Sequence, residues 1–463
     1  GSGIDVQTIV SQLVALEKAP LTQLETKANS IKTKISTYGT ISNQAAALGD
    51  AAFKLASASG WNAVTANSSN PSAIGVKASA GAPVTSLTMQ VSQLARAQST
   101  ASSAIATGSA VGTGSLTIEL GRWSGSTFTA GDADPVTVTI AEGEDSLAEI
   151  AASINDADAG VSAIVLKDSS GERLLLRSKE TGAENSFRIT ASDDDGNHTD
   201  GTGLSRLSYT GSGGASGTTQ TQAAQNALST INGVAVETAS NTLSDTLPGL
   251  TVQLSQVTTA PVEIDVSTDQ DAIRSNVQNF ISAYNALNTT LVTTTKYDAG
   301  TKVAGTLQGD STAVGLQNAL RGVMRSMTGG SPFSRLVDIG IEIKTGGTMS
   351  LDEEKFGAAL ADLDGLKDLF MANTGDPATE GIGRRVDAFA DGLLATDGML
   401  TNRKEGLEKA KERNSDEQDR VLDRAARAET RYLAMYNAMD ANVAKLNSLS
   451  AFVSQQITLW NKG

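Results

Sequence analysis

Apolar residues recur in steps of three and four over residues 21–55, the spacing of one face of an α-helix. The pattern shifts by one irregular step at Ile41. Such a stripe is typical of a coiled coil with a phase shift, and equally of an amphipathic helix that packs on its own domain. Pro20 fits a helix start, or a kink between this helix and the shorter apolar stretch at residues 4–16. In both interpretations the stripe needs a partner to bury it.

The other end of the chain carries a heptad pattern. A seven-residue repeat runs from Tyr432 to Trp460, and a second series lies between its members. Asn442 and Gln456 make two of these core positions polar, and polar core residues lower stability but can fix register or partner number. The segment upstream, residues 403–431, is densely charged and predicts a helix with favourable i,i+4 pairs. We interpret its charges as a solvated face.

Both terminal stripes are therefore predicted to take part in assembly. An isolated apolar seam leaves hydrophobic surface in water, and contact with the other terminus, a neighbouring copy or a partner protein removes that cost. The residues predicted to form this assembly interface are Ile4, Ile9, Leu13, Leu16, Leu24, Ile31, Ile35, Tyr38, Tyr432, Met435, Met439, Asn442, Leu446, Leu449, Val453, Gln456 and Trp460.

The middle of the chain has a different pattern. From about residue 66 to 266 it is rich in Gly, Ser and Thr and contains alternating stretches that predict β-strands. A capping-box sequence, Ser146 with Glu149, predicts one short helix there. Residues 168–171 carry a turn signal, and helical patterning returns after residue 267. The predicted strands cover residues 136–140, 161–167, 173–178, 250–256 and 262–266.

These patterns predict an α+β multidomain protein, in which terminal coiled-coil-like helices and a helical leg domain flank two nested β-rich head domains. Two low-complexity stretches, residues 99–114 and 211–222, are interpreted as crossings between lobes. The predicted domains are a terminal helical coiled-coil domain (1–42 and 403–463), a mainly helical leg domain (43–66 and 267–402), an inner β-rich head domain (67–110 and 223–266) and an outer inserted β-rich head domain (111–222).

Composition narrows the possible functions. The chain has 463 residues with 51 Asp and Glu against 36 Lys and Arg, which gives a formal net charge of −15. An acidic chain repels phosphate backbones, so nucleic-acid binding is disfavoured. No stretch approaches about 20 uninterrupted apolar residues, so membrane insertion is not predicted. The start of the chain lacks the basic and apolar regions of a signal peptide, so we expect no cleaved signal peptide.

Residue types that carry out catalysis are scarce. The chain has no cysteine and one histidine, His198, which excludes thiolate sites and multi-histidine metal sites. The glycine-rich stretch at residues 211–217 lacks the third glycine of a dinucleotide fingerprint and is interpreted as a linker. The acidic stretch at residues 193–200 lacks the first acidic ligand and the bidentate glutamate of a calcium loop, and we interpret it as a solvated loop. We therefore predict no enzymatic activity, no cofactor and no metal site.

Several segments match one family in order along the chain. They are GIDVQTIVSQLVALEKAP (3–20), INGVAVETASNTLSDTLPGLTVQL (231–254), LQGDST (307–312), DIGIEIKTGGTMSLDEEKF (338–356) and YNAMDANVAKLNSLSAFVSQQI (436–457). These segments resemble the bacterial flagellar filament cap family, also called the flagellar hook-associated protein 2 family. Residues 150–189 resemble the repeat motif of flagellin-type and hook-associated proteins, which would lie in the outer head domain. Residues 99–133 and 196–225 match no motif.

The resemblance implies a structural protein that caps the distal tip of the flagellar filament. Its copies would form a ring, often a pentamer, that retains exported flagellin and promotes flagellin folding and insertion during growth. It further implies hook–filament junction proteins and an export chaperone as partners, and secretion by the flagellar type III route to the filament tip. The alternative is a tip-exposed adhesin that binds host surfaces or mucin, which the Ser/Thr/Gly-rich outer lobe permits.

Overall fold

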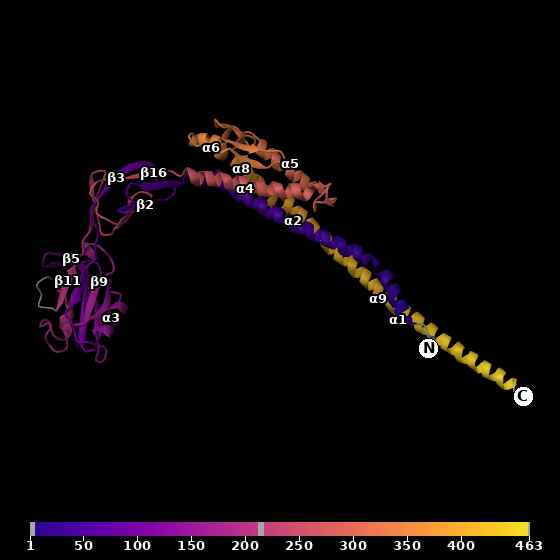
Figure 1. Cartoon of the computed structure of the whole chain (residues 1–463), viewed down its shortest axis with the longest axis horizontal. Coiled ribbons are helices and arrows are strands. Elements are labelled where there is room, and N and C mark those ends of the chain that lie inside the picture. The colour runs from indigo at the N-terminus through magenta and orange to yellow at the C-terminus, as the bar shows by residue number, and fades with distance from the viewer. Residues whose placement is uncertain (1–4, 212–216, 462–463) are drawn as a thin grey trace. The chain divides into compact units, whose positions relative to one another are not determined.

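The computed structural model describes residues 5–211 and 217–461, which form a helical unit and a β-rich unit (Figure 1). The helical unit combines the two ends of the chain, up to Trp61 and from Gln270 onward. The β-rich unit is the continuous segment Asn62–Asp269 between them. The predicted α+β multidomain fold class is thereby confirmed. The finer division into four domains stays a prediction.

The helical unit contains the amphipathic segments expected from the sequence. A short break at Lys18 separates its first two helices, and Pro20 lies in the first turn of the second. Proline is tolerated there because the N–H groups of the first turn have no partner within the helix. Its helices are α1 (Val6–Glu17), α2 (Ala19–Ala56), α4 (Gln270–Thr295), α5 (Ser311–Arg325), α6 (Glu353–Ala359), α7 (Leu363–Met371), α8 (Ile382–Leu394) and α9 (Met399–Trp460), with two antiparallel hairpins, β17 (Tyr297–Asp298) with β18 (Val303–Ala304) and β19 (Ile341–Ile343) with β20 (Met349–Leu351).

One hydrophobic core runs through the helical unit. It extends from Ile31 on α2 to Leu407 on α9, so it continues across the predicted boundaries at residues 42 and 402. Helices α2 and α8 pack closely, because a Cβ added at Gly49 would lie 2.9 Å from the Cβ of Ala390. Trp61 is buried in the same core, where its ring nitrogen donates to the carbonyl oxygen of Leu55 at 2.8 Å.

In the β-rich unit, one part has a core formed by residues from two antiparallel sheets. Its strands alternate buried and exposed residues, as in β16, where Val262, Ile264 and Val266 are buried. The first sheet has the order β1 (Val64–Ser68), β16 (Val262–Thr268), β3 (Thr85–Gln93), β12 (Ala227–Ile231) and β13 (Val234–Thr238), and the second has the order β14 (Thr242–Leu247), β15 (Leu250–Leu254) and β2 (Ile74–Ala78).

The other part of the β-rich unit has a separate core, to which one α-helix and the short 3-10 helix Gly203–Leu207 contribute. The α-helix is α3 (Leu147–Asp156), and it starts with the capping box of Ser146 and Glu149 that the sequence predicts. One sheet contains β10 (Ser186–Asp193), β5 (Gly114–Ser124) and β6 (Thr127–Ala130), with β7 (Val136–Ile140) paired to β5, and another has the order β11 (Thr218–Gln222), β4 (Ser99–Ser102), β9 (Gly171–Ser178) and β8 (Val161–Asp168).

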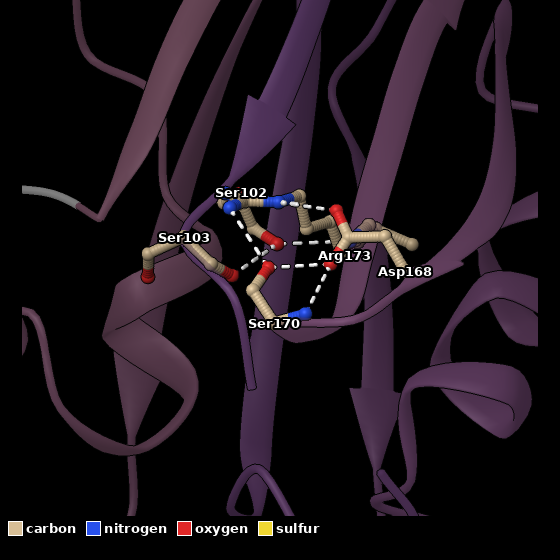
Figure 2. Close-up of polar contacts among 6 residues, drawn as sticks. Ser102, Ser103, Asp168, Ser170 and Arg173 are labelled. Carbon is tan, nitrogen blue, oxygen red and sulfur yellow. Dashed lines mark hydrogen bonds and ion pairs between the residues drawn. The ribbon is translucent and has the colours of Figure 1, made fainter. Parts of the chain in front are cut away.

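Each of the two low-complexity stretches predicted as crossings contains a strand, β4 in the first and β11 in the second. These two strands pair with each other. Arg173, which lies on β9 just after the β8–β9 turn, holds β4 in place (Figure 2). The Arg173 guanidinium donates to the carbonyl oxygen of Ser102 at 3.3 Å, and its Nε lies 3.6 Å from Asp168 Oδ2. Ser170 donates to the other oxygen of Asp168 from its backbone N–H at 2.7 Å, which keeps the turn closed. Sequence composition alone did not reveal these strands.

The acidic loop is organised by internal hydrogen bonds. Asp193 is buried and accepts a hydrogen bond from the backbone N–H of Ser205 at 2.9 Å. His198 is exposed, and its Nδ1 accepts from the backbone N–H of Asp193 at 3.0 Å. Among the residues that the structure describes, no group of three or more His, Asp and Glu is placed to hold a metal ion. Of the glycine-rich stretch, residues 212–216 lie outside the described ranges.

Candidate assembly surface

The N-terminal helices pack antiparallel on α9. At the end of α1, Glu17 Oε2 lies 3.3 Å from Nε of Arg424 on α9. On α2, the Tyr38 ring centroid lies 5.9 Å from the guanidinium of Arg403, which is earlier on α9. Residue numbers therefore rise along α9 as they fall along α2 and α1. At the α1 end, Val10 is buried with Ala425. The terminal stripe thus has a partner within its own chain.

The packing face of α9 lies within the segment interpreted as a solvated face. Most of its charged side chains are exposed, but buried residues recur between them. In the described residues, no ion pair forms at the three places where i,i+4 spacing predicts one: Glu405–Lys409, Asp416–Arg420 and Asp423–Arg427. The interpretation was therefore wrong for one side of this helix, because a seven-residue repeat was hidden among the charges. The buried positions on that repeat are Leu400, Leu407, Asn414, Val421 and Ala428.

A buried carboxylate joins three helices beside this seam. Asp310 starts α5, where its Oδ1 accepts hydrogen bonds from the backbone N–H groups of Thr312 and Ala313. The Tyr38 hydroxyl donates to Oδ1 at 2.8 Å, and Arg403 donates to Oδ2 at 2.6 Å. Burial acts to raise the pKa of Asp310, but the hydrogen bonds from Arg403 and Tyr38 outweigh it and hold the pKa below its ordinary value. Burial and the Asp310 hydrogen bond raise the pKa of Tyr38, so its hydroxyl remains a donor.

The N-terminal residues of the predicted interface fall into distinct environments. Ile31 and Tyr38 are buried in the core of the helical unit, and Ile35 packs against that core. Ile9, Leu13 and Leu24 are half-buried, whereas Leu16 is 72% exposed. Ile4 lies outside the described residues. The structure therefore places several of these residues inside the subunit, and their part in assembly stays a prediction.

The C-terminal residues of the predicted interface are mostly exposed. Tyr432 and Tyr436 pack against the Val10 cluster, but α9 continues to Trp460, past the end of α1 (Figure 1). Asn442 and Gln456 are both exposed. The remaining residues of the predicted interface, Met435, Met439, Leu446, Leu449, Val453 and Trp460, are between 38% and 88% exposed.

We name the exposed apolar face of this last part of α9 the distal stripe; it consists of Met439, Leu446, Leu449, Val453, Ile457 and Trp460. Phe452 and Leu459, which the heptad prediction left out, are also exposed, at 56% and 60%, and widen the apolar surface. A count of all apolar residues over residues 439–460 could have found them. No helix in the described part of the chain is both long enough and apolar enough to span a membrane.

Protein-family models match most of the chain. The flagellar hook-associated protein 2 N-terminus model matches residues 2–98, and the C-terminus model of the same family matches residues 224–448. A third model, the flagellin hook IN motif, matches residues 126–180 between them. This last match overlaps the segment 150–189 that resembles the flagellin-type repeat.

Curated relatives and solved structures agree with these models. The flagellar hook-associated protein 2 of Escherichia coli K12 is 31% identical, over 98% of this chain and 96% of that protein. The B-type flagellar hook-associated protein 2 of Pseudomonas aeruginosa is 28% identical over 94% of this chain and 92% of its own length. The D1-D2-D3 domains of the Escherichia coli flagellar cap protein FliD match with a TM-score of 0.63 and 30% identity, over 80% of this chain and 99% of that structure. The chain belongs to the flagellar hook-associated protein 2 family.

Proposed function

We propose that this protein is a structural cap at the distal tip of the bacterial flagellar filament. Copies of the chain form a ring that retains exported flagellin and promotes its folding and insertion. Family membership and the likeness to a solved flagellar cap protein support this role. The observation that carries the mechanism is the distal stripe, an apolar face on about 20 residues of helix, which extends roughly 30 Å at 1.5 Å per residue.

The distal stripe is suited to a contact that is made and remade. Full burial of one Leu or Val side chain stabilises a contact by about 1.5–3 kcal/mol, so several together hold a neighbouring helix firmly. Asn442 and Gln456 interrupt the stripe with amides that an all-apolar seam would not have. They keep the contact weak enough for the cap to move as each flagellin subunit is added.

The remaining parts of the proposal follow from the family. The ring is a pentamer, and its partners are flagellin, the hook–filament junction proteins and an export chaperone. The protein reaches the filament tip by the flagellar type III route. It acts without catalysis, and its net charge of −15 disfavours nucleic acid as a partner. The adhesin alternative has no specific support among the described residues.

The test places a charge on the distal stripe in a bacterium whose own cap gene is deleted. Leu446→Glu puts a carboxylate at the centre of the stripe, whereas Asn447→Glu adds the same charge to the neighbouring, also exposed position off the stripe. We expect Leu446→Glu cells to leak flagellin monomer and grow short filaments or none, and Asn447→Glu cells to grow filaments of normal length.

A truncation provides the second arm. Removal of residues 436–463 would also remove Tyr436, which packs on the α1 cluster, so a stop after Asp440 is the sharper variant. We expect this variant to fold, as judged by its circular dichroism, and to fail in capping. Filaments of normal length from either the truncated chain or Leu446→Glu would show that the distal stripe is not the capping element.

A further inference from the structure

A pocket of about 480 Å³ lies between α5 and the β19–β20 hairpin in the helical unit. Three cationic side chains, those of Arg321, Arg325 and Lys344, line it, and none of the described residues around it is acidic. The pocket is thus a concentrated positive site in a chain whose net charge is −15. None of the residues that line it belongs to the distal stripe.

The three cations form no ion pair within the part of the chain that the structure describes. Elsewhere in the helical unit basic side chains pair with carboxylates, as Arg274 does with Glu353. Within the described ranges, however, no carboxylate lies within 4.0 Å of the charged groups of Arg321, Arg325 or Lys344. The Nε of Arg321 is buried and also lacks a hydrogen-bond partner there. A buried donor without an acceptor is costly, so this guanidinium is poised to receive an acceptor.

Rigid elements position the pocket. The Tyr284 hydroxyl on α4 donates to the carbonyl oxygen of Gly347 at 2.8 Å, and Asn288 donates to that of Gly346 at 3.2 Å, so α4 fixes the hairpin turn. Gly347 leaves space for Arg321, because a Cβ at Gly347 would lie 3.3 Å from its Nε. Burial raises the pKa of Tyr284, while the positive charges of Arg321 and Arg325 act in the opposite direction, as expected if both guanidinium groups lie near its hydroxyl.

We propose that this pocket binds carboxylate side chains of a neighbouring copy of the chain, and so sets the contact between subunits. Guanidinium groups recognise carboxylates through paired, charge-assisted hydrogen bonds. Copies that each carry 15 excess negative charges repel one another, and a basic pocket on each copy supplies local attraction that also fixes their register. This inference rests on the proposed ring, and it names a contact within it.

The test reverses two exposed charges of the pocket in the full-length protein. The variant is Arg325→Glu with Lys344→Glu, and the control is Lys54→Glu with Lys302→Glu. The control changes the net charge by the same amount. It also matches the structural positions: Lys54 lies in the last turn of α2, as Arg325 does in α5. Lys302 lies in a hairpin, as Lys344 does. Self-association is measured by sedimentation velocity, and binding of a fluorescent hexaglutamate peptide by anisotropy.

We expect the pocket variant to self-associate at least tenfold more weakly than the wild type and to lose peptide binding, while the control behaves as the wild type does. The double glutamine variant, Arg325→Gln with Lys344→Gln, should show the same loss, which separates charge removal from any folding defect of the glutamates. Unchanged self-association of the pocket variants overturns the proposal, whether or not the peptide binds. A wild-type chain that stays monomeric at all concentrations would instead overturn the ring itself.

Discussion

The Tyr38 hydroxyl donates a 2.8 Å hydrogen bond to the carboxylate of Asp310, a residue 272 positions away in sequence. The same carboxylate accepts from Arg403 on α9 and from the first backbone N–H groups of α5. One buried side chain therefore ties α2, α5 and α9 together. Asp310 belongs to the LQGDST segment by which the sequence resembles its family, so the structure gives that motif a physical role.

Removal of the Tyr38 donor should destabilise the helical unit. Tyr38→Phe keeps the buried ring but leaves Asp310 with one fewer hydrogen bond, and a hydrogen bond to a charged group contributes about 1.5–3 kcal/mol. Tyr284→Phe is the matched comparison, because its equally buried hydroxyl donates to an uncharged carbonyl, and should cost about 0.5–1.5 kcal/mol. Urea unfolding followed by circular dichroism measures both. A smaller loss for Tyr38→Phe than for Tyr284→Phe would contradict this account.

The stability of the helical unit should depend on acid through Asp310. Folding lowers the pKa of this carboxyl, so its contribution is fully present above the unfolded pKa of about 4 and is lost as the pH falls through the folded pKa. Asp310→Asn should therefore be less stable than the wild type at pH 7, and the difference should begin to shrink below about pH 4. The free energy of unfolding at pH 7, 5 and 3 tests this. A difference that stays constant down to pH 3 would show that the charge of Asp310 does not matter.

The packing of α1 on α9 should depend on a small residue. Ala425 is fully buried against Val10 and Val14, so Ala425→Glu would place a charge at this contact and should detach α1. Ala426→Glu, at the exposed neighbouring position, is the control. Hydrogen exchange of the α1 amides reports the result, with at least tenfold faster exchange expected for Ala425→Glu alone. Equal exchange in the two variants would mean that α1 is not held by this seam.

Replacement of the polar residues Asn442 and Gln456 by leucine should tighten assembly. Both side chains are exposed in the subunit, so the unfolding of the isolated chain should change by less than about 0.5 kcal/mol. The seam with a partner would become fully apolar, so filaments should grow more slowly and remain shorter. Filament length measured by electron microscopy in motile cells is the readout. Filaments as long as those of the wild type would rule out a role for the two amides in cap movement.

The β-rich unit shows which features are predictable from local sequence. The capping box of Ser146 and Glu149 and the alternation in β7 and β16 act within a few residues, so helix and strands appear where expected. Strand β4 was not expected, because Ser99–Ser102 has no alternation of large apolar side chains. It is held by pairing with β9 and β11 and by the hydrogen bond from Arg173. Such a strand depends on neighbours that are distant in sequence.

The candidate surface follows the same division. The repeat from Tyr432 to Trp460 was predicted from sequence, because helical periodicity fixes which residues share a face. The buried repeat from Leu400 to Ala428 was missed, because charged residues surround it. The sequence by itself determined the terminal helices, the α+β class and the family, whereas the exposure of Asn442 and Gln456 in the subunit appears only in the structure. Tertiary structure decided which repeat is buried. Helices α1 and α2 cover α9 as far as Tyr436, whereas the large apolar side chains from Met439 to Trp460 are exposed. The amphipathic pattern shows that a face can be buried, but the presence of a packing partner decides whether it is.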